Sequence, residues 1–196
     1  LMLAAFGCGD GKGISIKPAE PPAPVMVAEF PHLDTSYAAV AFFPDGTRIA
    51  SGTRDNLVRI WNIQEKKESG SFKGHKNVVL TVAVSPDEKL VASGSTDKDV
   101  RTWNPDTGEC VSVFSGSLFD VFSLAFSPDG KELASGAGDD LVRIWNLETK
   151  RKKRILHGHV YCVHAVAYSK GGTYIASGCY ADTIRLWDAK TYKLIK

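Results

Sequence analysis

The sequence predicts an all-β protein built from four consecutive four-stranded antiparallel sheets. The four tryptophans lie at Trp61, Trp103, Trp145 and Trp187, so each follows the one before by 42 residues. The segments around them align at this spacing without a gap. The chain also holds 18 glycines and 9 prolines, which indicates many turns and therefore many short strands. A fixed spacing of this size is typical of a unit that buries its faces only by stacking on copies of itself.

Each unit reads as four strands separated by turns. In the second unit, four stretches rich in apolar and β-branched residues stand at 78–85, 90–95, 100–103 and 110–114. Turn residues such as Pro86-Asp87 separate them, and no helical periodicity interrupts the pattern. We expect strands of the first unit near 36–43, 47–53, 57–62 and 67–73. Their counterparts follow 42, 84 and 126 residues later.

The composition is that of an ordinary folded protein. Of 196 residues, 43% are hydrophobic and 23% are charged, which leaves ample material for a core. The net charge, 24 − 22 = +2, does not by itself indicate a nucleic-acid or membrane surface. No apolar run approaches the roughly 20 residues of a membrane-spanning helix. No Cys-x-x-Cys spacing points to a zinc ribbon among the four cysteines, Cys8, Cys110, Cys162 and Cys179.

The repeats carry the marks of a known family. Gly74-His75 and Gly158-His159 precede the tryptophans by about 30 residues, and Trp187-Asp188 ends the last unit. The other three units end in Trp-Asn. Over residues 30–196 the chain resembles the WD-repeat β-propellers. The resemblance implies that each unit is one propeller blade, with blades near 32–73, 74–115, 116–157 and 158–196.

The resemblance also implies a buried hydrogen-bond chain in each blade. It leads from the tryptophan through a hydroxyl to the histidine and ends on a turn aspartate. In the second blade these residues are Trp103, Ser95, His75 and Asp97. A buried indole N–H needs an acceptor, and an aspartate fixes the imidazole tautomer. Because the set recurs along the chain, we interpret it as structural rather than catalytic.

The other blades carry the set incompletely. The first has Thr53, Asp55 and Trp61, with Pro31-His32 one residue off register. The third keeps Asp139 and Trp145 but has Ser117 for the histidine and Ala137 for the hydroxyl. The fourth has His159 and Trp187 but Cys179 for the hydroxyl and Ala181 for the aspartate. The second blade is therefore expected to be the best ordered.

The two ends of the repeat region both supply an outer strand. Residues 25–30 occupy the outer-strand position of a preceding blade, and 191–195 that of the fourth blade. One of them is surplus in a closed ring of four blades, and family members usually have seven. We therefore expect a fragment of a larger propeller, or a half that closes as a homodimer with a second copy. Uncovered blade faces would otherwise associate.

Residues 1–24 are expected to lie outside the propeller. An apolar run with small residues ends at Cys8, which resembles the end of a bacterial lipoprotein signal. The Pro-rich stretch at 17–24 reads as a spacer. Lipidation at Cys8 would place the protein in the cell envelope, with the anchor as its only membrane contact. The alternative is an incidental cysteine in a cytoplasmic protein.

Two further features allow more than one reading. The basic run at 150–154 fits either nucleic-acid binding or an edge strand protected by charge against aggregation. Without interleaved aromatic residues, we favour the second reading and expect no nucleic-acid partner. Cys162 and Cys179 could face each other across a hairpin. Two buried free thiols are favoured over a disulfide.

Two classes of function are compatible with such a propeller. A propeller enzyme, such as a metal-dependent lactonase or hydrolase, would need acids or histidines recurring on the innermost strands. These strands begin near 38, 80, 122 and 164, where His164 stands alone and no carboxylate recurs. No Gly-x-Ser-x-Gly motif or phosphate-binding loop is present either. We therefore favour a non-catalytic interaction scaffold without metal or cofactor. The alternatives are such a propeller enzyme or a sensor domain of a larger multidomain protein.

The partner is expected to be a protein or peptide bound at one rim. In the family's geometry, the loop after Gly-His and the loop with the turn aspartate share that rim. Large side chains dominate binding hot spots, so the candidate residues are Arg54, Phe119, Tyr161 and Tyr180. The alternative for the third blade is that Leu118 and Phe119 fold inward and fill the space of the missing histidine.

Overall fold

The computed structural model describes residues 36–181 and 183–196, in which fifteen strands and no helix are found. The first blade holds β1 (Tyr37–Phe42), β2 (Arg48–Thr53), β3 (Val58–Asn62) and β4 (Lys67–Phe72). The second holds β5 (Val79–Val84), β6 (Val91–Ser95), β7 (Val100–Trp103) and β8 (Cys110–Phe114). The third holds β9 (Val121–Phe126), β10 (Glu132–Ala137), β11 (Val142–Asn146) and β12 (Arg151–Leu156). The fourth holds β13 (Val163–Tyr168), β14 (Tyr174–Cys179) and β15 (Ile184–Asp188).

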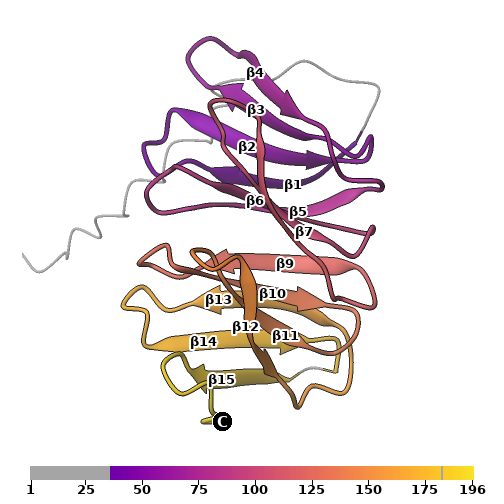
Figure 1. Ribbon diagram of the computed structural model, residues 1–196, viewed down its shortest axis with the longest axis vertical. Helices are drawn as coiled ribbons and strands as arrows, with labels where there is room; N and C mark the ends of the chain where they lie inside the picture. Colours follow the sequence, from indigo (N-terminus) through magenta and orange to yellow (C-terminus); the bar gives the residue numbers. More distant parts are fainter. Residues whose placement is uncertain (1–35, 182) are drawn as a thin grey trace, which may run out of the picture.

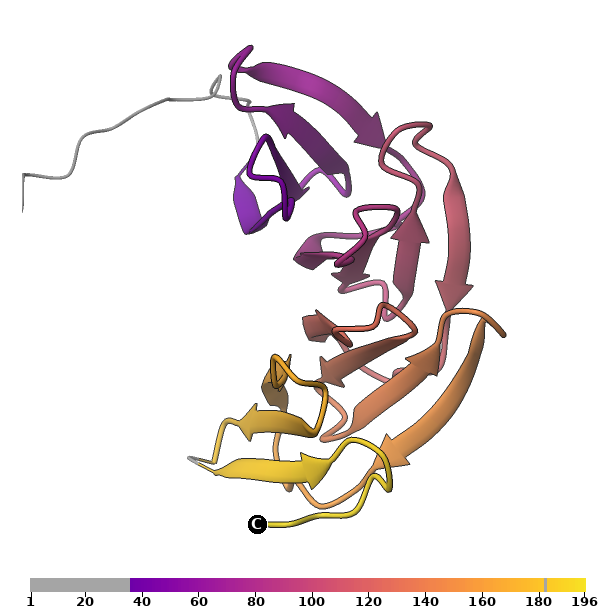
Figure 2. The ribbon, with the colours of Figure 1, turned by 90° about the vertical axis from the view of Figure 1, so that its left-hand side faces the viewer.

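Each sheet is an antiparallel meander whose strands pair in sequence order. The four sheets follow one another along the molecule (Figure 1). Seen from the side they form an arc, with the first strands of the blades on its inner side and the fourth strands outside (Figure 2). The first strands β1, β5, β9 and β13 contact their neighbours in turn. The prediction of all-β propeller blades is confirmed.

The fourth blade differs from the prediction. It has three strands, and the segment after them is joined to β15 by an isolated bridge between Trp187 and Leu194 and by backbone hydrogen bonds such as that from Ile195 N to Leu186 O at 2.7 Å. Tyr192 turns the chain with a positive φ of 59° and donates its N–H to Asp188 O at 2.7 Å. The segment lies along β15 but forms no full strand.

Three hydrophobic clusters hold the blades together, one at each junction. At every junction a glycine of one blade receives a valine of the next. A Cβ at Gly94 would lie 2.6 Å from Val121 Cγ1, and a Cβ at Gly136 would lie 2.7 Å from Val163 Cγ1. No side chain larger than hydrogen fits at that distance, which explains why the repeated Ser-Gly sequence is needed in the second strand of each blade.

The two end faces of the arc are apolar and uncovered among the described residues. Val40 of β1 is 68% exposed, whereas its counterpart Val82 is 7% exposed against the first blade. Ile184 of β15 is 80% exposed, whereas its counterpart Val142 is fully buried against the fourth blade. Both faces therefore have the composition of a blade junction without its neighbour. Closure by a second copy stays a prediction.

Several sequence predictions fall on other parts of the chain. The segment 1–24 with Cys8, the strand at 25–30 and His32 lie outside the described residues. Within the described part, no helix is long and apolar enough to cross a membrane. Cys162 and Cys179 are half-buried free thiols, so they form no disulfide.

The basic run lies on the outer strand of the third blade. Residues 151–154 of β12 are exposed. Lys153 Nζ reaches Glu132 Oε1 at 2.5 Å and lies 5.4 Å from the ring centroid of Tyr192. One of these cations therefore ties the third blade to the fourth, as expected of a charged edge strand rather than of a free basic patch.

Candidate interaction site

One end of each blade is defined by a bond between two loops. The residue after the second strand donates its backbone N–H to the carbonyl of the residue before the first strand. These pairs are Arg54 to Ser36, Thr96 to Val78, Gly138 to Asp120 and Tyr180 to Cys162, at 2.9–3.1 Å. The four pairs of loops thus share one geometry. We call the surface formed by these loops, at the same end of all four blades, the rim.

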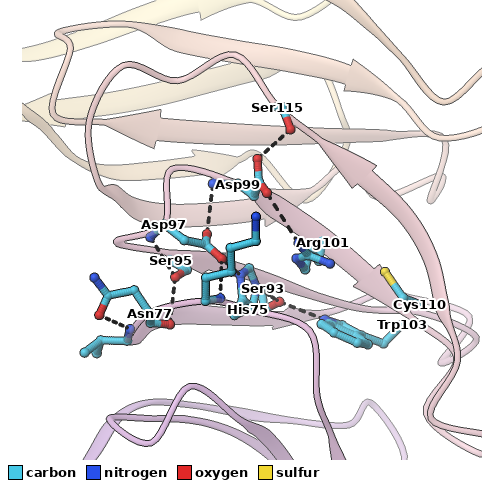
Figure 3. A network of polar contacts seen from close by, with 12 residues as sticks. His75, Asn77, Ser93, Ser95, Asp97, Asp99, Arg101, Trp103, Cys110 and Ser115 are labelled. Atoms are coloured by element: carbon cyan, nitrogen blue, oxygen red, sulfur yellow. Dashed lines mark hydrogen bonds and ion pairs between the residues drawn. The ribbon is translucent and has the colours of Figure 1, made fainter.

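The second blade has a complete hydrogen-bond chain below the rim (Figure 3). Trp103 Nε1 donates to Ser93 Oγ at 2.8 Å, and His75 Nε2 lies 2.7 Å from the same oxygen. His75 Nδ1 lies 2.9 Å from Asp97 Oδ2. The backbone N–H of Lys76 also donates to Asp97 Oδ2, at 2.8 Å. The aspartate thus holds both the imidazole and the loop that follows it.

The hydroxyl of this chain belongs to Ser93, so the prediction of Ser95 is wrong. Trp103 lies opposite Val91 in the pairing of β6 with β7. Ser93 is the next residue on the same side of β6, within diagonal reach of the indole, whereas Ser95 lies one step further. Ser95 Oγ instead donates to Asn77 O at 2.9 Å and accepts the N–H of Asp97. It therefore shapes the rim turn rather than the chain.

The same serine acceptor is present in all four blades. The hydroxyl is a serine ten residues before each tryptophan, and every indole donates to it at 2.8 Å. The acceptors are Ser51, Ser93, Ser135 and Ser177. The predicted loss of the hydroxyl at Ala137 and Cys179 is therefore wrong, because these residues occupy the position of Ser95. The blades differ only at the histidine and the aspartate.

Burial and hydrogen bonding set the charge states of the second blade's chain. Burial lowers the pKa of His75 against the opposing influence of Asp97, so the imidazole is neutral at pH 7. Burial alone would raise the pKa of Asp97, but the hydrogen bonds from Lys76 and His75 outweigh it and lower the pKa. The neutral imidazole donates from Nδ1 to the Asp97 carboxylate, which fixes the ring between Asp97 and Ser93.

In the third blade an arginine replaces the histidine as the partner of the aspartate. Arg143, 3% exposed, holds Asp139 through two hydrogen bonds of 2.8 and 2.7 Å. Asp139 Oδ2 also accepts the backbone N–H of Leu118 at 2.7 Å. Burial would raise the pKa of Asp139, but these bonds together lower it. The loop is therefore pinned without a histidine, while Ser117 is buried with no partner for its hydroxyl among the described residues.

The pinned loop directs its apolar side chains outward. Leu118 is 68% exposed and Phe119 is 58% exposed. The alternative that they fold inward to replace the histidine is therefore wrong. Burying them would require the loop to leave Asp139, and the backbone N–H of Leu118 would then lose its acceptor.

The first blade binds its arginine in the same way. Arg59 Nη2 donates to Asp55 Oδ2 at 2.6 Å, and Arg59 Nη1 donates to Thr53 Oγ1 at 2.8 Å. The Arg59 guanidinium lowers the pKa of Asp55 to about 2. Arg54, next to this pair, is exposed on the rim.

In the fourth blade the aspartate is absent. Trp187 Nε1 donates to Ser177 Oγ, and His159 Nε2 lies 2.7 Å from that oxygen, as in the second blade. Ala181 stands where the second blade has Asp97. His159 is 6% exposed, and its Nδ1 has no hydrogen-bond partner among the described residues. Burial lowers the pKa of His159, and the charge of Arg185 lowers it further.

Aromatic side chains gather on the rim of the third and fourth blades. In each blade one residue of the first strand is skipped in the pairing with the second; in these two blades it is Phe122 and His164. The rings of Phe122 and His164 lie 4.5 Å apart, and those of His164 and Tyr180 lie 6.2 Å apart. Both Phe119 and Phe122 border Gly138, whose Cβ would lie 3.0 Å from Phe119 Cβ. We call Phe119, Phe122, His164 and Tyr180 the aromatic patch.

The structure brings together only part of the predicted rim set. Phe119 and Tyr180 belong to the aromatic patch, and Tyr180 is 77% exposed. Tyr161, 56% exposed, precedes Cys162, which contacts Gly138 in the middle of the patch. Arg54 lies on the first blade, two blades away. Phe122 and His164 were not predicted as rim residues. They stand at the skipped positions that Ala38 and Leu80 occupy in the first two blades.

His164 does not form part of a metal site in the described residues. Within the part of the chain that the structure describes, no group of three or more His, Cys, Asp or Glu side chains could hold a metal ion. The imidazole of His164 lies between two aromatic rings instead. The imidazole is therefore part of the aromatic cluster with Phe122 and Tyr180.

The repeats match a known family model over most of the chain. Four consecutive matches to the family "WD domain, G-beta repeat" cover residues 26–62, 66–104, 108–146 and 150–188. The chain belongs to the WD40 family. Each matched WD repeat ends with the third strand of a blade. Apart from the first, each begins one or two residues before the outer strand of the preceding blade. Each sequence repeat therefore spans parts of two consecutive blades.

A more distant similarity covers a single stretch. The chain is 32% identical over 50 residues to Pre-mRNA-processing factor 19 homolog 2 of Arabidopsis thaliana. The match spans 26% of this chain and 10% of that relative. It supports the repeat assignment and reaches only a small part of the relative.

Proposed function

We propose that this WD40 protein is a non-catalytic scaffold that binds a protein or peptide partner at the rim of its third and fourth blades. Membership of the WD40 family supports protein interaction in general. The observation that carries the proposal is the aromatic patch, in which Phe122 and His164 lie on strands and Phe119 follows Leu118, whose N–H is bound by Asp139. Rigid, exposed aromatic side chains contribute large contact areas at a modest entropic cost. No cofactor and no nucleic-acid partner is part of this proposal.

The shape of the patch favours a partner with apolar or aromatic side chains. Tyr161, Phe119 and Leu118 add exposed apolar area next to Tyr180. None of these side chains belongs to the buried chains that stabilise the blades. Their exposure therefore is not explained by the packing of the fold, and an interaction surface explains it.

The test uses peptides selected from a displayed random library against the wild-type protein. The double variant Tyr161→Ala/Tyr180→Ala should weaken binding of the selected peptides by about tenfold or more, because truncated hot-spot aromatics cost that much. The matched control Asp45→Ala/Asp87→Ala changes exposed turn residues at the opposite end of the blades. Equal losses in both variants, or a loss in the control alone, would contradict the proposal.

A further inference from the structure

The fourth blade lacks the carboxylate to which its neighbours' buried donors bind. In the second blade Asp97 accepts hydrogen bonds from His75 Nδ1 and from the N–H of Lys76. In the third blade Asp139 accepts from Arg143 and from the N–H of Leu118. The equivalent residue of the fourth blade is Ala181. The side chain that receives these donors is therefore missing, while the donors remain.

The fourth blade keeps both donor positions of the second blade, where His75 and Arg101 stand. His159 corresponds to His75, and Arg185 corresponds to Arg143. His159 Nδ1 is buried and has no hydrogen-bond partner among the described residues, whereas His75 Nδ1 pairs with Asp97. Arg185 forms no ion pair among the described residues, whereas Arg101 pairs with Asp99 and Arg143 pairs with Asp139. The guanidinium lies over Gly158, next to His159, because a Cβ at Gly158 would be 3.0 Å from Arg185 Nη1. The two side chains thus stand side by side at the base of one loop.

The hydrogen bonds below His159 decide which of its ring nitrogens carries the proton. Trp187 Nε1 donates to Ser177 Oγ, so the serine oxygen already accepts one hydrogen bond. The Ser177 hydroxyl then donates to His159 Nε2, which is the acceptor it has at 2.7 Å. A neutral imidazole that accepts at Nε2 carries its proton at Nδ1. The unpaired group is therefore an N–H donor, and what it needs is an acceptor.

The backbone around the site has the geometry of the complete blades. Val163 pairs with Cys179 as Val79 pairs with Ser95. The bond from Tyr180 N to Cys162 O repeats the equivalent bond of the other rims, at 3.1 Å. The position of a carboxylate at residue 181 is therefore conserved in space, although the side chain is not present. Ala181 is half-buried and Tyr180 is exposed, so the position can be reached from solvent.

We propose that the fourth blade binds a carboxylate group of the partner, with His159 Nδ1 and the Arg185 guanidinium as its donors. The partner's aspartate or glutamate side chain takes the place that Asp97 and Asp139 occupy in their own blades. A carboxylate has the planar shape that a guanidinium pairs with through two hydrogen bonds. Tyr180 directly precedes Ala181, and Tyr161 lies two residues after His159. This inference therefore rests on the proposed function and specifies the chemistry of that partner.

The test observes the two imidazoles in one spectrum. Long-range ¹H–¹⁵N spectra of the labelled full chain are recorded during titration with N-acetyl-aspartate N-methylamide, against sodium chloride at equal ionic strength. The His159 and Arg185 signals should shift with a millimolar dissociation constant, as expected for a ligand with few atoms. The His75 signals should stay, because Asp97 already occupies that position. No shift of His159, or an equal shift of both histidines, would overturn the proposal.

Variants separate this site from a general effect of charge. Ala181→Asp supplies the carboxylate from the chain itself, so the response of His159 should weaken by at least about tenfold. Asp140→Asn removes a carboxylate of the third blade whose charge acts on His159, and its response should be equal to or stronger than that of the wild type. An Ala181→Asp protein that responds like the wild type would contradict the site.

Further probes define the source of the carboxylate and keep the two proposals apart. N-acetylglycine offers a terminal carboxylate instead of a side chain, so a stronger response to it would assign the site to a C-terminus. Inorganic phosphate that binds as well as the aspartate derivative would overturn the carboxylate assignment. None of these titrations needs the partner. A silent titration with peptide binding still lost in Tyr161→Ala/Tyr180→Ala would remove this site alone and leave the proposed function standing.

Discussion

The second and fourth blades show how one repeat can be a closed structural unit in one place and an open one in another. Both have the same strand register and the same tryptophan–serine–histidine hydrogen bonds. In the second blade His75 Nδ1 is hydrogen-bonded to Asp97, and both faces of the sheet are covered by neighbouring blades. In the fourth blade His159 Nδ1 has no hydrogen-bond partner among the described residues, and one face of the sheet is exposed at Ile184.

The comparison separates the positions of the repeat that stabilise the fold from those at which the residue can change. The serine and tryptophan lie in the buried middle of every sheet, where an unpaired indole N–H would be costly. The aspartate lies at the rim, where water or a ligand can replace it. Substitution at residue 181 therefore converts a structural position into a candidate binding position without changing the backbone. Three experiments test this contrast between the second and fourth blades.

The largest expected effect comes from adding one methyl group at the glycine that faces the next blade. In Gly94→Ala the new Cβ would lie 2.6 Å from Val121 Cγ1 and 2.8 Å from Thr81 Cγ2. We expect the free energy of unfolding to fall by about 1–3 kcal/mol, since a packed junction has no room for the methyl group. Urea titration followed by tryptophan fluorescence measures the change.

The matched variant is Gly178→Ala in the fourth blade. Here the nearest atom is Ala165 Cβ at 3.8 Å, an ordinary contact distance. We expect no loss, and a gain of up to about 1 kcal/mol from the lower entropy of alanine in the unfolded chain. Equal losses in the two variants would show that the uncovered face of the fourth blade is in fact covered in solution.

The second experiment turns the second blade into a copy of the fourth. Asp97→Ala leaves His75 Nδ1 and the N–H of Lys76 without their acceptor. We expect a loss of about 1–3 kcal/mol, the cost of leaving a buried donor unpaired. Glu148→Ala, at an exposed turn, serves as the control and should change stability by less than about 0.5 kcal/mol. An Asp97→Ala protein as stable as the wild type would show that water satisfies these donors.

The sequence could predict the blades because their signals are local. The spacing of the tryptophans, the alternation of apolar residues and turns such as Pro44-Asp45-Gly46, whose glycine has a φ of 70°, each fix one element. The strand positions could therefore be predicted from neighbouring residues alone, without knowledge of contacts distant in sequence. The exception is the last outer strand, because the pattern at 191–195 says nothing about how much of it pairs.

The sequence could predict the rim only in part, because side-chain reach depends on pairing. Ser93 and Ser95 are both serines on one side of the same strand, and only the register of β6 with β7 decides which meets the indole. The outward direction of Phe119 follows from the bonds of Asp139 to Arg143 and Leu118, which join three separate segments. The skipped residues Phe122 and His164 become rim residues only through the irregular pairing of the first strands.

The smallest expected effect is on the pH dependence of stability. Burial lowers the pKa of His75 below its ordinary value of 6.5, while the hydrogen bond to Asp97 opposes that shift. Such a group contributes its full stability above pH 6.5 and loses it as the pH falls toward the folded-state pKa, because the unfolded chain then binds the proton more readily. Wild-type protein should therefore be less stable at about pH 5 than at about pH 7.5. The pKa of Asp97 itself is lowered below 3.8, so its own titration lies outside this range.

The two variants should change this pH dependence in opposite directions. Asp97→Ala removes the hydrogen bond that opposes the lowered pKa of His75, so it should increase the loss of stability at acid pH. Ala181→Asp should reduce that loss through His159, and each change should be less than about 1.4 kcal/mol. Urea titrations at the two pH values measure these slopes, and identical slopes in all three proteins would show that the turn carboxylate does not distinguish the second blade from the fourth.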